Sequence, residues 1–227
     1  MKIATPKPGL FTNTGTRSGR EHIVPPRLTQ NSLVQAVEIL SKRDPDLARL
    51  AHRHGPPPLW ERPQGFRTLI QIILEQQVSL ASAKAMLYRL SARITPFTPE
   101  QFLSAGVSYL RDLGLTRQKT AYCIHLAEAI VRQELDLDAL ALMNDQAVSM
   151  ALTQIKGIGP WTAQIYLLMA LLRPDIWPSG DIALAESFRR VKALKTRPSN
   201  EALAAHAESW RPYRAVAARM LWHHYLS

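Results

Sequence analysis

Residues 152–171 have the sequence LTQIKGIGPWTAQIYLLMAL, in which two apolar helical patterns meet at Gly157-Ile158-Gly159. Glycine adopts backbone conformations that other residues avoid, so this pair allows a sharp turn and a close approach to a partner. Pro160 suits the first turn of the second helix, where a missing N–H breaks no hydrogen bond. The free N–H groups of that turn and the positive end of the helix dipole form a site for phosphate. The segment therefore predicts two helices joined by a tight, anion-binding turn.

The turn resembles the helix-hairpin-helix motif of DNA-binding proteins, which holds one DNA strand through its phosphates without reading the base sequence. A Gly-x-Gly pair alone is weak evidence, because many tight turns between helices contain one. Here an apolar residue and a lysine precede the pair, and a Thr-Ala step follows it. The resemblance implies that phosphate is bound by Lys156, Gly157, Ile158, Gly159 and Thr162. A purely structural turn is the alternative.

The rest of the chain predicts an all-α fold. Apolar residues recur at three- and four-residue spacing from about residue 31 onward, and no stretch alternates with period two for long enough to make a strand. We expect about ten helices with short connections, the first of them capped by Ser32. Residues 1–30 mix Pro, Gly, Thr and basic residues without any period, so they predict a flexible basic tail.

The net charge favours a polyanionic partner. The chain has 28 Lys and Arg against 18 Asp and Glu, a formal net charge of +10 and a sequence pI near 10.1. Nucleic acid is the partner that this charge favours most, although ribosome-associated and membrane-surface proteins share it. No apolar run reaches the length of a membrane helix, and the first residues lack the apolar core of a secretory signal. We expect a cytoplasmic protein, nuclear if eukaryotic, and not a secreted one.

Several classes of site are excluded by residues that the chain lacks. Cys123 is the only cysteine, which rules out an internal disulfide and any cysteine-rich zinc or iron–sulfur site. The seven histidines show no metal-ligand spacing with acidic partners, and His223-His224 is predicted to be a surface pair. No Walker loop, G-x-S-x-G or HExxH motif is present.

A second informative segment, RPDIWPSGDIALAESFRRV, covers residues 173–191. Its Pro-Ser-Gly sequence predicts a loop, and Asp181 follows at the start of a helix. Aspartate is among the best N-cap residues, so on local evidence alone Asp181 is a helix cap worth about 1 kcal/mol. A functional interpretation comes from its place shortly after the hairpin.

A helix-hairpin-helix followed by a Gly/Pro-rich loop and an aspartate resembles the HhH-GPD DNA glycosylases, in which this aspartate is the essential carboxylate. The resemblance implies that Asp181 is catalytic. The N–H groups and dipole of the helix favour its ionised form. At about 4 Å and an effective dielectric of about 20, that charge stabilises an oxocarbenium ion by roughly 4 kcal/mol, about a thousandfold in rate. The same carboxylate can orient the attacking water.

Position 161 separates the branches of the superfamily. Members that also cut the DNA strand carry a lysine just after the hairpin, whereas this chain has Trp161 there. The resemblance therefore implies a monofunctional enzyme that uses water. Branches with a four-cysteine iron–sulfur loop are excluded because Cys123 stands alone. From about residue 60 to the end, the chain is most similar to the 3-methyladenine-type alkylbase glycosylases.

That resemblance also assigns residues that contact DNA. LIQIILEQQVSLASAKAMLYRL, residues 69–90, is similar to the family's helix–turn–helix, whose turn inserts one residue into the duplex. Gln77 occupies this place and is expected to fill the gap left by the flipped nucleotide. The block at residues 110–130 implies contacts to the DNA backbone from Arg117 and Lys119.

The base pocket of the family is aromatic, and its residues match Trp161 and Trp222. At the place of a third aromatic stands Ile165, so the neighbouring Tyr166 is expected to line the pocket instead. Electron-rich ring faces attract the cationic bases 3-methyladenine and 7-methylguanine by roughly 0.5–2 kcal/mol. The glycosidic bonds of these bases are already weakened, so no strong general acid is needed.

The resemblance implies two helical lobes with an active-site cleft between them. One lobe is expected at residues 64–175 and contains the hairpin, while the other combines residues 31–63 with residues 176–227. The β-rich domain that precedes this region in one bacterial type is expected to be absent. The implied partner is double-stranded DNA with damaged bases, bound by a monomer.

No cofactor is expected to be required. The hairpin of the family can hold Na⁺ or K⁺ through backbone carbonyls, which here are those of Thr153, Ile155 and Ile158. Such an ion would bridge to phosphate and take no part in the chemistry.

Three functional hypotheses remain on the sequence alone. The first is a glycosylase that flips 3-methyladenine, 7-methylguanine and related alkylated bases out of duplex DNA and hydrolyses the N-glycosidic bond. The second is a glycosylase for deaminated or oxidised bases, which Gln77 and Ile165 leave open. The third is a non-catalytic DNA-binding module, which would have no need of Asp181 in that loop.

Overall fold

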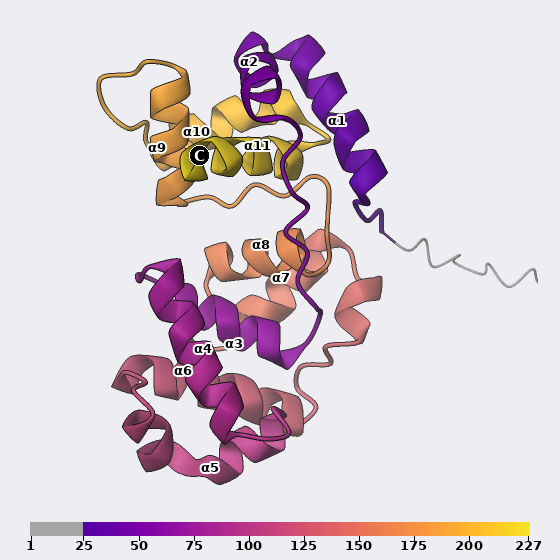
Figure 1. Ribbon diagram of the computed structural model, residues 1–227. Helices are drawn as coiled ribbons and strands as arrows, with labels where there is room; N and C mark the ends of the chain where they lie inside the picture. Colours follow the sequence, from indigo (N-terminus) through magenta and orange to yellow (C-terminus); the bar gives the residue numbers. More distant parts are fainter. Residues whose placement is uncertain (1–24) are drawn as a thin grey trace, which may run out of the picture.

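The structure is a computed structural model that describes residues 25–227 (Figure 1). The all-α prediction is confirmed, because residues 25–227 contain helices and no β-strand. The α-helices are α1 (Gln30–Arg43), α2 (Pro45–His54), α3 (Phe66–Glu75), α4 (Leu80–Arg93), α5 (Pro99–Asp112), α6 (Arg117–Val131), α7 (Asp145–Thr153), α8 (Pro160–Met169), α9 (Ile182–Val191), α10 (Asn200–Ala207) and α11 (Arg214–Leu226). Two short 3₁₀ helices are η1 (Ala139–Leu142) and η2 (Glu208–Trp210). Among the described helices, none is long and apolar enough to cross a membrane.

Helices α3 to α8 pack together as one group, which we call the hairpin group (Figure 1). α3 contacts α4, α6 and α8. Seven of its ten residues are buried, and the three that are not, Arg67, Gln71 and Glu75, recur every fourth position along one polar stripe. α7 and α8 pack against each other, so they form the two helices of the predicted hairpin.

Helices α1, α2, α9, α10 and α11 form the second group, which we call the terminal group (Figure 1). α11 is its central helix and contacts α1, α2 and α9. All residues of α11 from 215 to 222 are buried, whichever way they point. The chain passes between the two groups through residues 55–65 and again through residues 170–181 (Figure 1).

A fully buried arginine ties the two groups together. The Arg219 guanidinium on α11 donates to the carbonyls of Leu168 at 2.7 Å, Leu59 at 3.0 Å and Ala215 at 3.1 Å. Leu168 belongs to α8, and Leu59 to the first crossing segment. No acidic side chain among the described residues pairs with Arg219, and burial lowers its pKa to about 9. The group therefore stays charged at neutral pH and is satisfied by carbonyl oxygens from three segments.

The start of the described chain differs from expectation. Thr29, not Ser32, is the N-cap of α1, and Ser32 is the third helical residue of a capping box with it. Leu28 is already buried, and its N–H donates to the Leu172 carbonyl at 2.8 Å. The predicted tail, residues 1–30, is therefore too long by at least three residues, 28–30. The rest of that prediction, residues 1–24, lies outside the described part.

Candidate active site

Asp181 caps α9 and lies where the two helix groups meet. Its Oδ1 accepts a hydrogen bond of 2.9 Å from the backbone N–H of Leu184, which confirms the predicted N-cap. Oδ1 also accepts from the indole N–H of Trp222 at 3.2 Å. Oδ2 accepts from the indole N–H of Trp161 at 3.1 Å. Three N–H donors therefore hold one carboxylate.

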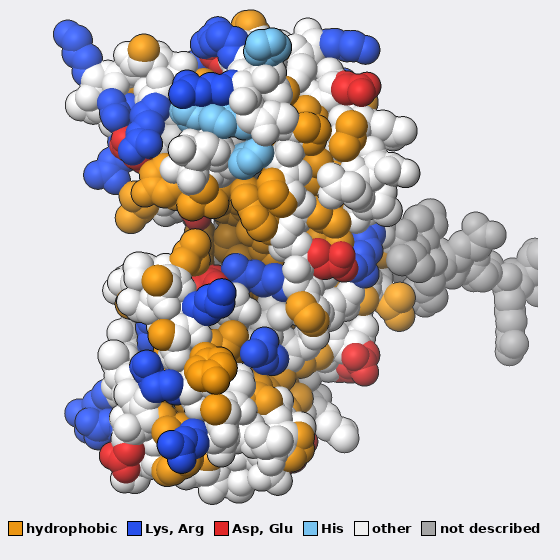
Figure 2. Space-filling view, in the orientation of Figure 1, with side chains coloured by type: hydrophobic (Ala, Val, Ile, Leu, Met, Phe, Trp, Pro, Cys, Tyr) orange, Lys and Arg blue, Asp and Glu red, His pale blue; other side chains and the backbone are white. Residues whose placement is uncertain are grey.

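The two indoles come from opposite helix groups. Trp161 lies in the first turn of α8, in the hairpin group, and Trp222 lies on α11, in the terminal group. An indole N–H can only donate, so the carboxylate orients both rings, and hydrogen bonds to an ionised group are the stronger kind. Trp222 is 8% exposed, while Asp181 and Trp161 are half-buried. Figure 2 shows a hollow between the groups with hydrophobic side chains gathered on both of its sides.

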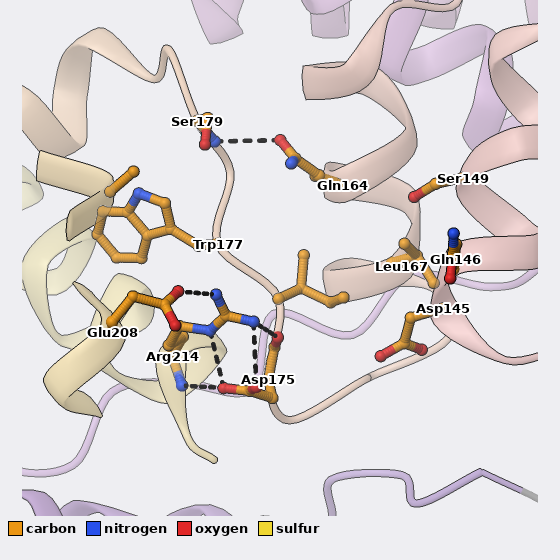
Figure 3. Close-up of a pocket in the computed structure, with 12 residues that line it drawn as sticks. Asp145, Gln146, Ser149, Gln164, Leu167, Asp175, Trp177, Ser179, Glu208 and Arg214 are labelled. Carbon is orange, nitrogen blue, oxygen red and sulfur yellow. Dashed lines mark hydrogen bonds and ion pairs between the residues drawn. The ribbon is translucent and has the colours of Figure 1, made fainter. Parts of the chain in front are cut away.

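The loop that leads to Asp181 is anchored to both groups (Figure 3). The backbone N–H of Ser179 donates to Gln164 Oε1 of α8 at 3.0 Å. Asp175 accepts from the Arg214 guanidinium of α11 at 2.9 Å, and Arg214 also pairs with Glu208. A cavity of about 350 Å³ is lined by this loop and by residues of α7 and α8, but not by Asp181. The cavity therefore lies beside the loop and not at the carboxylate.

The helix that Asp181 caps, α9, is fixed against α11 by one buried polar contact. The Ser187 hydroxyl is fully buried and donates to the Leu221 carbonyl at 2.7 Å. Leu221 directly precedes Trp222, so this bond fixes the helix of the carboxylate beside the helix of one indole.

The hairpin between α7 and α8 has the geometry that its glycines predict. Gly157 has φ +98°, and a Cβ at this position would lie 2.1 Å from Cγ of Tyr122, so no side chain fits. Within residues 25–227, the N–H groups of Gly157, Gly159 and Thr162 donate to no protein acceptor. The exposed Lys156 directly precedes them. The turn therefore offers backbone donors and an ammonium group to an anion.

Comparison with known families identifies this arrangement. The model of the HhH-GPD superfamily of base excision DNA repair proteins matches residues 70–212, which contain the hairpin and Asp181. The chain belongs to the HhH-GPD superfamily. DNA is therefore its partner, in agreement with its net charge of +10.

Individual relatives agree with the HhH-GPD assignment. The chain is 28% identical over 181 residues to DNA-3-methyladenine glycosylase 1 of Schizosaccharomyces pombe, and the match covers 78% of this chain and 79% of that protein. It is 26% identical over 170 residues to DNA-3-methyladenine glycosylase 2 of Escherichia coli, with 70% and 57% covered. The structure of S. pombe 3-methyladenine DNA glycosylase in complex with abasic DNA matches with a TM-score of 0.75 at 27% identity, covering 83% of this chain and 95% of that one. The predicted resemblance is confirmed.

Gln76 links the HhH-GPD hairpin to the end of α3, and the sequence did not reveal it. Its side-chain Nε2 donates to the Gly157 carbonyl at 2.9 Å and to Thr162 Oγ1 at 3.0 Å. Thr162 is 2% exposed, so its hydroxyl is not available to a phosphate as predicted, and only its backbone N–H remains for that role. The partners of Gln76 lie more than eighty positions away, beyond any local pattern.

Gln77 lies between α3 and α4 and is exposed. Its φ of +57° is uncommon for a residue other than glycine, and such a conformation persists only where the surrounding structure fixes it. Its role as a DNA wedge stays a prediction.

The two predicted contacts from α6 have different surroundings. Arg117 is exposed in the first turn and is free to meet a phosphate, so its role stays a prediction. The Lys119 ammonium instead donates to the Leu74 carbonyl at 2.5 Å, at the C-terminal end of α3. Burial lowers the pKa of Lys119. This bond stabilises the turn that carries Gln77, and the role of Lys119 as a phosphate ligand stays a prediction.

Tyr166 does not line the hollow, contrary to expectation. Its side chain is fully buried, and its hydroxyl accepts a hydrogen bond of 3.0 Å from the backbone N–H of Gly65. Ile165 is 3% exposed. α8 is apolar nearly all round, so adjacent residues face different parts of the core and a neighbour does not substitute for a missing pocket residue. Trp161 and Trp222 are the aromatic residues that reach Asp181.

The predicted monovalent cation site can be judged from its carbonyls. Within the described residues, those of Thr153 and Ile158 accept no hydrogen bond, and that of Ile155 accepts one from the Ile158 N–H at 2.9 Å. Carbonyl oxygens suit a hard cation, so the donors fit, and the site stays a prediction. Residues 25–227 contain no group of three His, Cys, Asp or Glu side chains that could hold a metal ion.

His223 and His224 are not the surface pair that was expected, because both are half-buried and contact His54. His224 Nδ1 lies 3.1 Å from His54 Nε2 of α2, and both side chains are half-buried. The ring of His223 lies 5.6 Å from that of His54 between centroids. These residues join α2 to α11 and form no part of the candidate site.

Proposed function

We propose that this chain is a monofunctional DNA glycosylase that hydrolyses the N-glycosidic bond of alkylated bases, such as 3-methyladenine and 7-methylguanine, flipped out of duplex DNA. One observation carries the proposal. A single carboxylate, Asp181, is held between two indoles at the meeting of two helix groups, with a phosphate-binding hairpin on the same helix as one indole.

The proposed reaction needs little from the protein beyond charge and orientation. The C1′–N bond breaks, and its electron pair leaves with the cationic base, which thereby becomes neutral without a proton donor. Positive charge develops on the sugar, and the fixed Asp181 carboxylate stabilises it. Water then adds its oxygen to C1′, and its proton passes to Asp181 or to solvent.

The aromatic groups around Asp181 support an alkylated base as substrate. The indoles of Trp161 and Trp222 converge on the carboxylate, so a base that enters beside Asp181 meets electron-rich rings. Rings of this kind favour a cation over a neutral base by about 0.5–2 kcal/mol. The S. pombe and E. coli relatives are named 3-methyladenine glycosylases, which supports the same substrate class.

The surroundings of Asp181 also support water as nucleophile. Trp161 stands where strand-cutting members of the superfamily carry a lysine. The nearest lysine before it in the sequence, Lys156, lies exposed on the hairpin, and Lys119 is bound to a carbonyl of α3. We also propose that the protein acts as a monomer, because one lesion requires only one pair of helix groups.

The decisive test compares wild type with Asp181→Asn on methylated duplex DNA. Asparagine is an equally good N-cap, so the variant keeps the bond to Leu184 and is expected to fold and bind DNA normally. We expect its release of 3-methyladenine to fall at least about a thousandfold, since the fixed charge contributes roughly 4 kcal/mol.

Product gels run before and after hot alkali complete this test. Strand breaks that appear only after alkali support the monofunctional reaction, and breaks before alkali contradict it. If wild type binds DNA but releases no base from a panel of alkylated, deaminated and oxidised lesions, the protein is a binding module instead.

A further inference from the structure

The positive charge of this protein is not concentrated around the hairpin. Residues 64–175, which include the hairpin, carry ten Lys and Arg against nine Asp and Glu. Residues 25–63 together with 176–227 carry fourteen against eight. Any long-range attraction for DNA therefore originates mainly in the terminal group, which has no phosphate-binding hairpin.

Most cations of α9 and its C-terminal end are already paired. Arg189 and Arg190 both pair with Glu186, at 2.8 and 3.0 Å, and Lys192 pairs with Asp46 of α2. Two cations in the loop that follows, Lys195 and Arg197, have no acidic partner within residues 25–227. Both are exposed, as are the other residues from 193 to 197.

The loop is held at its two ends and projects between them. At its start, the N–H of Leu194 donates to the Arg189 carbonyl at 2.9 Å, and the Arg189 guanidinium donates back to the Leu194 carbonyl at 3.3 Å. At its end, the Ser199 hydroxyl caps α10. Such a pinned loop loses little conformational entropy when it meets a ligand.

The far end of the loop lies next to the candidate active site. A Cβ on Gly180, the residue before Asp181, would lie 3.8 Å from the side-chain nitrogen of Asn200. Asn200 begins α10, three residues after Arg197. Figure 2 shows Lys and Arg side chains gathered over α9 and this loop, on the side of the molecule where the hollow opens. The C-terminal end of the loop therefore lies beside Asp181 in the terminal group, while the hairpin group reaches the same carboxylate through Trp161.

We propose that Lys195 and Arg197 form a second phosphate-binding site for the DNA duplex, across the hollow from the hairpin. The inference rests on the proposed function. The hairpin holds the backbone on one side of the flipped nucleotide, and the loop between α9 and α10 holds the duplex on the other. Contacts of this kind carry no sequence information and position the duplex over Asp181.

The test measures the affinity of the Lys195→Ala/Arg197→Ala variant for a duplex with one tetrahydrofuran abasic analogue, over a series of salt concentrations. Each lost phosphate contact lowers the slope of log affinity against log salt by about 0.9, so we expect the slope to fall by about 1.8. Taken from 1 M down to 50 mM salt, this difference in slope weakens binding at 50 mM roughly two-hundredfold.

A matched control removes two other exposed cations, as Arg93→Ala/Arg132→Ala. Arg93 ends α4, about 20 Å along that helix from its start beside Gln77, and Arg132 is the C-cap of α6, about 20 Å along that helix from Arg117. This variant has the same net charge, and its salt slope is expected to equal that of wild type. An equal loss in both variants would overturn the proposal, because net charge alone would explain it.

The same experiment separates this inference from the proposed function. If wild type releases 3-methyladenine while Lys195→Ala/Arg197→Ala leaves the slope unchanged, the loop contact is refuted and the glycosylase stands. If the slope falls as expected but wild type releases no base, the loop contact stands and the proposed function fails.

Discussion

The hairpin group and the terminal group contribute different kinds of residue to one hollow. The hairpin group supplies backbone N–H groups, the exposed Gln77 and the indole of Trp161. The terminal group supplies the carboxylate of Asp181, the indole of Trp222 and most of the net positive charge. The first is therefore suited to grip the DNA backbone, and the second to act on the sugar and attract the polyanion. Neither group contains all of these residues, so the geometry around Asp181 depends on how the two groups are positioned relative to each other.

The largest effect on stability is expected in the hairpin, from Gly157→Ala. Alanine there has a strained φ of +98° and a Cβ 2.1 Å from Tyr122. Backbone strain and overpacking each cost about 1–3 kcal/mol, so we expect the free energy of unfolding to fall by about 3 kcal/mol. Denaturant unfolding measures this change.

Gly159→Ala is the matched control for that substitution. Gly159 has φ −89°, and nothing lies within 4 Å of its Cβ position. Its replacement at the N-cap of α8 is expected to lower stability by less than about 1 kcal/mol. Equal losses in the two alanine variants would show that the close packing on Tyr122 does not fix the turn.

A smaller effect is expected on catalysis when either indole loses its N–H. Trp161→Phe and Trp222→Phe each keep an aromatic ring but remove one hydrogen bond to Asp181. Hydrogen bonds to charged groups contribute about 1.5–3 kcal/mol, so each variant is expected to release base roughly tenfold to a hundredfold more slowly. Single-turnover base release measures both, with DNA affinity as the control.

Comparison of the two phenylalanine variants sharpens the contrast between the groups. Similar losses mean that the carboxylate depends equally on both sides of the hollow. A loss in Trp222→Phe alone means that the terminal group orients Asp181 by itself. Unchanged rates in both contradict the idea that the indoles position the carboxylate.

The smallest effect is expected from the histidines that join α2 to α11. Burial, helped by Arg53 and His223, lowers the pKa of His54, and burial, helped by His54, lowers that of His224. The folded state then binds fewer protons than the unfolded state just below pH 6.5, so the free energy of unfolding falls as pH drops through this region. His54→Gln/His224→Gln should flatten this dependence in thermal unfolding between pH 5 and pH 7. If the variant shows the same pH dependence as wild type, these two histidines do not cause the pH dependence of stability.

Sequence reasoning found those parts of the site that local patterns encode. Gly157 and Pro160 predict the turn between α7 and α8. Asp181 follows a loop of Pro, Ser and Gly at the start of a helix. The family resemblance then assigned Trp161 and Trp222, and the structure brings both to the carboxylate. Their roles in catalysis remain to be tested by the substitutions above.

Other parts depend on contacts between distant segments, which no local pattern contains. Gln76 reaches the hairpin more than eighty residues away, and Lys119 reaches a carbonyl of α3. Tyr166 was misplaced because α8 is apolar nearly all round, so its sequence does not say which face meets the hollow. The side chain of Thr162 was likewise counted as accessible although it faces Gln76.

Arg219 places a positive charge at the C-terminal end of α8, which is the negative end of the helix dipole. The guanidinium donates to the carbonyl of Leu168 in the last turn of this helix, where the peptide dipoles leave a partial negative charge. The other end of α8 begins with N–H groups that have no acceptor within residues 25–227. A buried cation thus lies at the C-terminal end of α8, about 15 Å along its ten residues from the end whose N–H groups are free. The protein interior therefore supports the dipole of α8 whether or not a ligand is bound.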